Sequence, residues 1–330
     1  MLTRVAISAF AMAAGAFCAL GQTSSVAAKP ANLKTSTNWT SSKTADGQPD
    51  LQGLWTNVTL TPLERPKELG DKPYFTEQEA IDYQKKLNAN LNKDRRDGGA
   101  AADLGRAYND VWWDFGTQLV KTRRTSLVID PPDGRVPPLT PEAQKAQEAR
   151  RQAGQIMAGP EDLPLQLRCI NWSTAGPPML PSAYNNNYRI LQVPGYVIIL
   201  IEMIHDVRVI PLDGRPHLPQ NVRQILGDSR GHWEGNTLVV DTTNFSDLTH
   251  FRGADRNLHL TERFTRTDQD TIIYQFTVDD PTAFTRQWTG EVPMLKFQGP
   301  IYEYACHEGN YSVANTLSGA RAQDKAQGNK

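Results

Sequence analysis

Apolar and polar residues alternate along much of the chain after residue 118, with the period of two that is typical of β-strands. The clearest example is a pair of segments, 258–265 and 271–278, that are separated by a polar turn and predict a β-hairpin. Shorter segments of the same kind end at residues 301–305. Successive short strands with tight turns predict a mainly β protein, built as an antiparallel barrel or sandwich.

Two helices are predicted outside this strand pattern, both in the N-terminal half. Thr76 and Glu79 form a Thr-x-x-Glu capping box ahead of a run of helix formers, which predicts a helix over residues 77–92. Pro141 follows Thr140 at the first position of a second predicted helix, near residues 141–157. The apolar face of the second helix is thin, so we expect these helices at the periphery of the β structure.

The chain begins with the pattern of an export signal. Arg4 precedes an apolar run that is too short to span a bilayer comfortably and that ends near small residues, which predicts a signal peptide over residues 1–28. Residues 29–50 lack periodicity and predict a flexible linker. We expect residues 51–320 to form a single β-rich domain and residues 321–330 a flexible tail. The mature protein would then be periplasmic or extracellular, without a membrane span.

The charge balance limits the class of partner. The chain has 35 Lys and Arg residues against 36 Asp and Glu residues, a net charge of −1, and no run of basic residues. This composition excludes the electrostatic footprint of a nucleic-acid-binding protein. We therefore expect the partner to be a small-molecule ligand or substrate.

The cysteines predict a cross-link. Removal of the signal peptide would take Cys18 away and leave Cys169 and Cys306. In an oxidising compartment this pair predicts a disulfide that ties the middle of the chain to its C-terminal part. A loop of this length would stabilise the fold by about 4 to 5 kcal/mol in the chain-entropy description. Two buried free thiols are the alternative.

Two acidic residues lie within apolar rows of the predicted strands. Alternation places Glu262 on the same face as Leu260 and Phe264. The strand that starts at Tyr196 is apolar on both faces, which predicts a central strand covered on both sides, and Glu202 follows at its end. Burial raises the pKa of a carboxyl group toward the range useful for general acid/base catalysis. A structural ion pair with an arginine is the alternative.

Further candidates for chemistry follow the same strand. An imidazole at His205 and a carboxylate at Asp206 could share proton transfer, and Arg208 could stabilise an anionic transition state. The six histidines of the chain all fall between His205 and His307. The candidate catalytic set is therefore Glu202, His205, Asp206, Arg208, Glu262 and His307.

Metal binding is an alternative use of the histidines. The weak candidates for metal ligands are His205, His232 and His259, but no His-Glu-x-x-His motif or other diagnostic spacing is present. We predict no cofactor, and a divalent metal is the alternative. Residues 227–231 match the Gly-x-Ser-x-Gly motif of hydrolases, but a strand follows in place of the required helix. The motif is therefore predicted to form a turn that Asp228 and Ser229 stabilise.

Three segments carry a family resemblance. They are Thr-Arg-Arg-Thr-Ser-Leu-Val-Ile-Asp-Pro-Pro-Asp-Gly-Arg at 122–135, Gly-His-Trp-Glu-Gly-Asn-Thr-Leu-Val-Val-Asp at 231–241 and Tyr-Ala-Cys-His-Glu-Gly-Asn-Tyr at 304–311. The chain resembles a large family of uncharacterised exported bacterial proteins over most of residues 50 to 320. The resemblance implies export from a bacterial cell, and it assigns no activity, ligand or catalytic residue to this chain.

Two functions of different classes are consistent with these patterns. The first is a secreted or periplasmic hydrolase or lyase that acts by general acid/base chemistry on a small organic or sugar-like molecule. The second is a non-catalytic, calycin-like or lipocalin-like protein that binds a small apolar ligand. An apolar cavity, with Glu202 and Glu262 held in ion pairs outside it, would favour the second.

Overall fold

A computed structural model describes residues 39–106, 109–154 and 157–328. The predicted signal peptide at 1–28 and most of the predicted linker lie outside the described residues. In the described part of the chain, no helix combines the length and the apolar character needed to cross a membrane.

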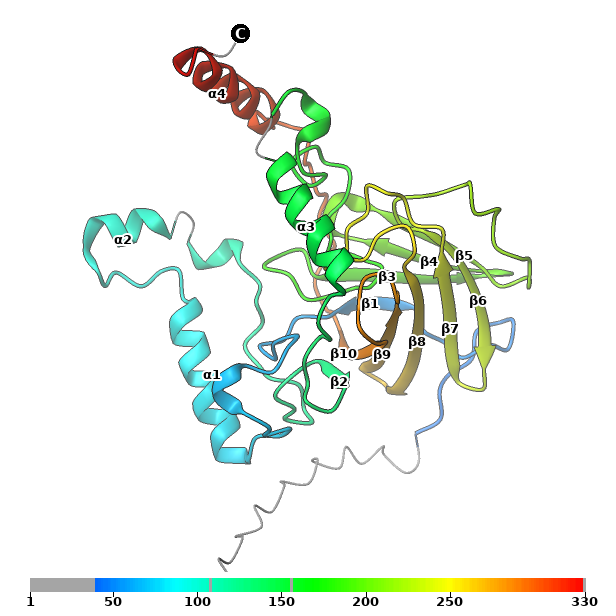
Figure 1. Ribbon diagram of the computed structural model, residues 1–330. Coiled ribbons are helices and arrows are strands. Elements are labelled where there is room, and N and C mark those ends of the chain that lie inside the picture. Colours follow the sequence, from blue (N-terminus) through cyan, green and yellow to red (C-terminus); the bar gives the residue numbers. More distant parts are fainter. Residues whose placement is uncertain (1–38, 107–108, 155–156, 329–330) are drawn as a thin grey trace, which may run out of the picture.

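Nine strands form one antiparallel, nearly closed barrel-like sheet, in the order β5-β4-β3-β1-β10-β9-β8-β7-β6, and the short β2 pairs with β10 (Figure 1). The strands are β1 (Gly53–Thr56), β2 (Val128–Asp130), β3 (Asn187–Val193), β4 (Tyr196–Ile201), β5 (Val207–Pro211), β6 (Asp228–Glu234), β7 (Thr237–Thr243), β8 (His259–Asp268), β9 (Thr271–Asp279) and β10 (Trp288–Lys296). This architecture confirms the predicted mainly β fold.

Strands β8 and β9 form the predicted hairpin. Glu262 lies opposite Phe276 and Phe264 lies opposite Tyr274, so each strand directs every second side chain into the barrel. The barrel interior is filled by large side chains, of which Trp55, Trp288, Tyr188, Tyr274, Phe245, Phe264 and Phe276 are fully buried. The barrel therefore has a packed core in place of the open interior of a lipocalin.

The two end strands of the sheet, β5 and β6, lie next to each other without a backbone ladder. Side chains close this seam. A Cβ atom at Gly231 of β6 would lie 2.7 Å from Leu212 and 2.9 Å from Ile210, so only glycine allows this approach.

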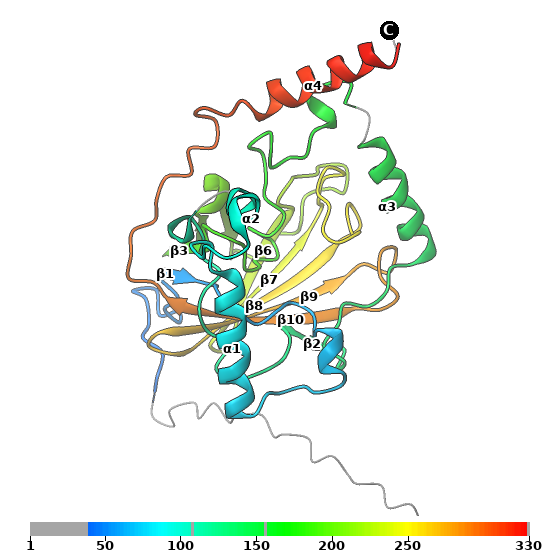
Figure 2. The same cartoon turned by 90° about the vertical axis from the view of Figure 1, so that its left-hand side faces the viewer.

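The helices lie outside the barrel (Figures 1 and 2). They are α1 (Glu77–Leu91), α2 (Gly99–Gly105), α3 (Pro141–Ala153) and α4 (Ser312–Ala326), with short 3₁₀ turns η1 (Lys67–Leu69), η2 (Asp110–Trp112), η3 (Pro160–Asp162) and η4 (Met203–His205). The predicted capping box is present, because the Thr76 hydroxyl accepts from the Glu79 amide and the Thr76 amide donates to the Glu79 carboxylate. Helix α3 has Pro141 at its start as predicted, but it ends at Ala153. The residues predicted as a tail from 321 are helical to Ala326 as the end of α4.

Helix α1 packs on a small core of its own. Leu60, Phe75, Ala80 and Leu119 are buried there, and Tyr83 of α1 packs against them. This cluster is separate from the main core of the barrel. Helix α1 has one apolar face, which packs on this cluster, and one polar face. This amphipathic pattern explains why α1 lies beside the barrel and is not inserted into it.

Two predictions about the β structure differ from the observed fold. Residues 301–305 form no strand and run as an irregular segment along the barrel. The outer face of β4 is not fully covered, because Ile198 and Leu200 are only half-buried and the neighbouring Val209 of β5 is 54% exposed. The sequence predicted that both faces of this strand would be covered, whereas the structure buries only the inner face completely.

Candidate functional site

The carboxylate of Glu262 is held by an arginine inside the barrel. Arg208 of β5 donates from Nη1 to Glu262 Oε1 at 3.0 Å and from Nη2 to Oε2 at 2.5 Å. The Tyr274 hydroxyl donates to Oε1 at 2.8 Å, and Arg208 also donates to Ser229 Oγ at 3.3 Å. Glu262 is completely buried and Arg208 is 3% exposed. The bidentate contact is the structural ion pair that the sequence left as an alternative.

The Glu262 carboxylate stabilises the charged form of Arg208. Burial by itself would lower the pKa of Arg208, but the adjacent Glu262 carboxylate outweighs burial and raises that pKa above its ordinary value. Burial raises the pKa of Tyr274 well above its ordinary value, so its hydroxyl stays protonated and donates. Arg208 also connects β5 to Ser229 of β6, so the ion pair helps to close the seam that lacks backbone hydrogen bonds.

Glu202 and His205 hold the C-terminal segment against the turn between β4 and β5. Glu202 is 2% exposed and accepts from Asn187 Nδ2 at 2.7 Å and from the Tyr302 amide at 3.0 Å. His205 Nδ1 lies 3.1 Å from the Tyr304 carbonyl oxygen, so the ring donates there. Glu202 and His205 thus each contact the segment 302–304. We call this segment the strap.

The predicted disulfide between Cys169 and Cys306 is present and anchors the same strap. His307 follows directly and is exposed on the far side of this bond.

The turn between β4 and β5 is strained. Ile204 has φ of 62° and His205 has φ of 51°, both in the left-handed region that side chains disfavour, and Ile204 is β-branched. Asp206 follows, and burial raises its pKa to about 6, although His205 partly opposes the shift. Its buried Oδ2 atom has no hydrogen-bond partner among the described residues.

The six candidate residues occupy three places in the fold, and buried Tyr188 lies within electrostatic range of both Arg208 and Glu202. Arg208 and Glu262 are inside the barrel, Glu202, His205 and Asp206 are at the turn after β4, and His307 is beyond the disulfide. The metal candidates are also apart, since His232 contacts Glu234 at 3.2 Å and His259 contacts Asp241. Within the described ranges, no group of three or more His, Cys, Asp or Glu side chains is arranged to hold a metal.

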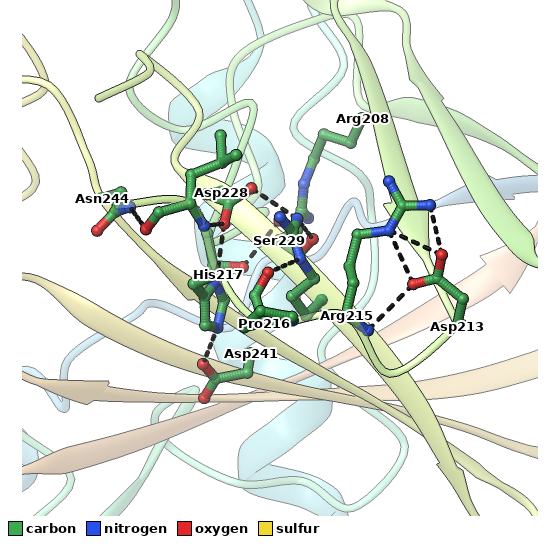
Figure 3. Close-up of polar contacts among 12 residues, drawn as sticks. Arg208, Asp213, Arg215, Pro216, His217, Asp228, Ser229, Asp241 and Asn244 are labelled. Atoms are coloured by element: carbon green, nitrogen blue, oxygen red, sulfur yellow. Dashed lines mark hydrogen bonds and ion pairs between the residues drawn. The ribbon is translucent and has the colours of Figure 1, made fainter. Parts of the chain in front are cut away.

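A network of alternating imidazoles and carboxylates lies on the outer face of the sheet. His217 joins Asp228 of β6 to Asp241 of β7 (Figure 3), and the network continues from Asp241 to His259 of β8. His217 Nδ1 is 2.9 Å from Asp228 Oδ2, and His217 Nε2 is 2.8 Å from Asp241 Oδ1. His259 Nε2 contacts the other oxygen of Asp241 at 2.5 Å. Because carboxylates only accept, each ring nitrogen of His217 faces a hydrogen-bond acceptor.

This network shifts the pKa of Asp241 and the pKa of His259 in opposite directions. Burial tends to raise the pKa of Asp241, but hydrogen bonds from His259 and His217 outweigh burial and lower it. The hydrogen bond to Asp241 raises the pKa of His259, against the opposing effect of burial.

Hydrogen bonds next to this network hold the long loop between β5 and β6 against the sheet. The Leu218 amide donates to Asp228 at 2.9 Å, Arg230 Nε donates to the Pro216 carbonyl at 3.1 Å, and Asn244 Nδ2 donates to the Leu218 carbonyl at 2.8 Å (Figure 3). The sequence did not predict these contacts, because no local pattern relates a loop histidine to carboxylates on two strands. The only signal is the polar row His259, Thr261, Arg263 and Thr265, which alternation places on the face opposite Glu262.

The Gly-x-Ser-x-Gly match forms no turn. Ser229 lies in β6 and points into the barrel, where its hydroxyl is 2.9 Å from Thr242 Oγ1 and accepts from Arg208. The predicted turn is therefore wrong, because the cross-strand pairing of β6 with β7 continues through these residues. Ser229 is 9% exposed and is part of the interior polar network.

A large cleft lies elsewhere, between α1, the turn at 118–123 and the outer face of β9 and β10. It has a volume of about 580 Å³ and largely apolar walls. None of the six candidate catalytic residues lines it. We call it the α1 cleft. A second cleft of about 550 Å³ lies on the other side of α1 and is lined by Tyr83, Leu87, Phe115 and Trp172, among others.

Comparisons with protein-family models, with curated proteins and with solved structures found no match to this chain.

Proposed function

We propose that the protein binds a small apolar molecule in the α1 cleft and performs no chemistry on it. The observation that carries this proposal is the separation of this largely apolar cleft from Glu262 and Glu202, which are engaged elsewhere. Glu262 is bound by Arg208, and Glu202 is bound by Asn187 and the strap. Carboxylates held in this way have lost the freedom that proton transfer to a substrate requires.

Three elements supply the apolar walls of the α1 cleft. They contribute Ala80 and Ile81 from α1, Leu119 and Val120 from the turn, and Ile273 and Leu295 from β9 and β10. A volume of about 580 Å³ is in the range of small-molecule sites, which bury most of the surface of their ligand. Apolar burial contributes about 25 cal/mol per Å², so an apolar ligand gains affinity from these walls without a charged partner.

Helix α1 is suited to adjust to a ligand. It rests on its own small core, which is separate from the barrel core, and clefts lie on both of its sides. Elements with few buried apolar contacts open at a lower free energy than the core does. Ligand binding is therefore expected to stabilise α1 more than the barrel.

The test is the binding of N-phenyl-1-naphthylamine, an uncharged apolar fluorophore, to the mature protein. Ile273→Asp places a charge on the wall formed by β9 and is expected to weaken binding at least about tenfold, because an unpaired carboxylate next to the ligand costs several kcal/mol. Val209→Asp is the matched control, since Val209 is an exposed apolar residue of β5 outside the cleft. Equal affinities of the two variants would contradict the proposal.

A specific observation supports a second candidate function, a hydrolase or lyase that uses Asp206 as general acid or base. Its pKa of about 6 and its unpartnered Oδ2 suit proton transfer near neutral pH. Hydrolysis of 4-nitrophenyl acetate should then increase as pH rises through about 6, and Asp206→Asn should abolish it without loss of thermal stability. Hydrolysis that is the same in this variant excludes the role.

A further inference from the structure

The α1 cleft contains polar atoms that its apolar walls leave without a partner. Three of the residues that line it, Thr122, Arg123 and Thr271, each have a buried side-chain nitrogen or oxygen atom that makes no hydrogen bond with any described residue. Thr271 as a whole is 5% exposed. Buried polar atoms are nearly always hydrogen-bonded, so three exceptions around one cleft point to a partner that the described chain does not supply.

Arg123 determines the chemistry of that partner. A hydroxyl group both donates and accepts, so Thr122 and Thr271 suit either kind of polar group. The Nε atom of Arg123 only donates, so its missing partner is an acceptor. A carboxylate matches a guanidinium best, because its two oxygens accept two parallel hydrogen bonds.

The next arginine in the chain has the carboxylate that Arg123 lacks. Arg124 Nη1 donates to a Glu291 carboxylate oxygen, and its Nη2 donates to the Glu291 carbonyl oxygen at 3.1 Å. Gln275 Nε2 donates to the other carboxylate oxygen at 2.7 Å. Glu291 lines the cleft, but both of its carboxylate oxygens are engaged by these contacts. Its charge is therefore used by Arg124 and not by Arg123.

The turn that carries Arg123 fixes its backbone at the cleft. Arg123 has φ of 60°, in the left-handed region that side chains disfavour. Its amide donates to the Val120 carbonyl at 2.8 Å, and its carbonyl accepts from the Phe75 amide at 2.9 Å. Strained residues persist where the surrounding structure fixes them, and they are frequent at ligand sites. The backbone is thus held in place, whereas no described residue holds the Nε atom, so the guanidinium can rotate toward a ligand.

The other charges around the cleft do not block an anion next to Arg123. Glu77 and Lys121 are exposed and of opposite sign, and solvent screens both. Asp268 belongs to the turn between β8 and β9, which the register of the sheet places beside the end of β10. Glu291, which the Arg123 turn contacts through its next residue, is four residues before that end, about 13 Å away at about 3.3 Å per residue.

We propose that the ligand of the α1 cleft is an amphipathic acid, an apolar molecule with one carboxylate that Arg123 binds and to which the Thr122 hydroxyl donates. This inference rests on the proposed binding of an apolar molecule in the cleft and adds the head group that selects it. The apolar walls supply contact area, and the guanidinium supplies selectivity for the acid over the corresponding alcohol or amine.

The experiment is displacement of N-phenyl-1-naphthylamine from the full mature chain by decanoate, 1-decanol and decylamine. The uncharged fluorophore reports the apolar cleft, whereas the three competitors share a chain and differ in head group. Arg123→Met should weaken displacement by decanoate about tenfold, because hydrogen bonds to a charged group are lost, and should change displacement by decanol less than about twofold. Arg189→Met, at an exposed arginine of β3 outside the cleft, is the matched control and should change neither.

Thr122→Val provides a second variant in case Arg123→Met does not fold, and it should weaken displacement by decanoate about fivefold, as loss of one hydrogen bond implies. Displacement by decanol together with a decanoate affinity that neither variant changes would overturn this inference and leave the proposed function intact. Tighter binding of decylamine than of decanoate would overturn it in the same way. Absence of fluorophore binding would contradict the proposed function and this inference together.

Discussion

The inner and outer faces of strands β6 to β8 carry polar networks made of similar residues in different surroundings. Inside, Arg208 and Glu262 are 2% and 0% exposed as side chains. Outside, His217 and His259 are 29% and 43% exposed, and their common partner Asp241 is 35% exposed. Each network joins segments far apart in the chain, but only the outer one is in contact with solvent.

This difference shows that an acidic residue in an apolar row is not by itself a sign of catalysis. Inside the barrel, the low dielectric makes an unpaired charge very costly, so Glu262 occurs with a bidentate partner and serves the fold. On the outer face, solvent lowers that cost, and the imidazoles can exchange protons with water. The outer network is therefore the one expected to respond to pH.

The strongest way to test this comparison is to break the interior pair. Glu262→Ala leaves Arg208 buried without its partner and should lower the free energy of unfolding by about 3–5 kcal/mol, measured by urea denaturation. Replacement of both residues, Arg208→Met with Glu262→Leu, should recover most of this loss. As the matched control, Arg263→Ala removes the exposed 2.7 Å pair with Glu234 and should cost less than about 1 kcal/mol. Equal losses from both pairs would contradict the comparison.

Removal of His217 should have the next largest effect. His217→Ala removes two hydrogen bonds to charged groups and should lower the free energy of unfolding by about 1–3 kcal/mol. Hydrogen exchange at the Leu218 amide should become faster, because the loop loses its anchor next to Asp228. His232→Ala, on the same outer face but with a single contact to Glu234, is the control. Unchanged exchange at Leu218 would show that the network does not hold the loop.

The outer network also predicts a pH profile. Since the pKa of folded His259 is raised above 6.5, its stabilisation is complete below that pH and is lost as pH rises through the folded value. Since the pKa of Asp241 is lowered below 3.8, its stabilisation is present above that pH and is lost as pH falls through the folded value. Unfolding free energies from pH 3 to 9 should show both slopes, and Asp241→Asn should reduce them. A variant profile that parallels the parent profile would exclude this origin.

An effect of the opposite sign is expected at Asp206. Its pKa rises from 3.8 to about 6 on folding, so folding disfavours its charged form and stability falls as pH increases through this window. Asp206→Asn should therefore raise the melting temperature at pH 8 and leave it nearly unchanged at pH 3. A lower melting temperature at pH 8 would mean that the carboxylate stabilises the turn.

Several elements of the fold could be predicted because their signals are local. The capping box of Thr76 and Glu79 marks the start of α1, and alternation identifies the hairpin of β8 and β9. Strand β10 was not predicted, because Gly290 and Pro293 interrupt its pattern. It is nevertheless central, pairing with β1, β2 and β9, and Pro293 is tolerated within it.

The candidate site was harder to predict than the fold. Alternation correctly placed Glu262 among apolar residues, but a row of side chains does not identify what lies opposite. The α1 cleft joins a helix, a turn and two strands that are distant in sequence, and each segment shows only an ordinary apolar face.

The amino-acid sequence by itself determined the β-rich class of this protein, the start of α1 and the pairing of Cys169 with Cys306. Only the tertiary structure decided that Glu262 binds Arg208, 54 residues away, and that His217 is held between two carboxylates. The physical reason is the range of the interactions. Hydrogen-bonded turns, caps and side-chain periodicity act between neighbours in the chain, whereas the partner of a charge depends on how the barrel closes.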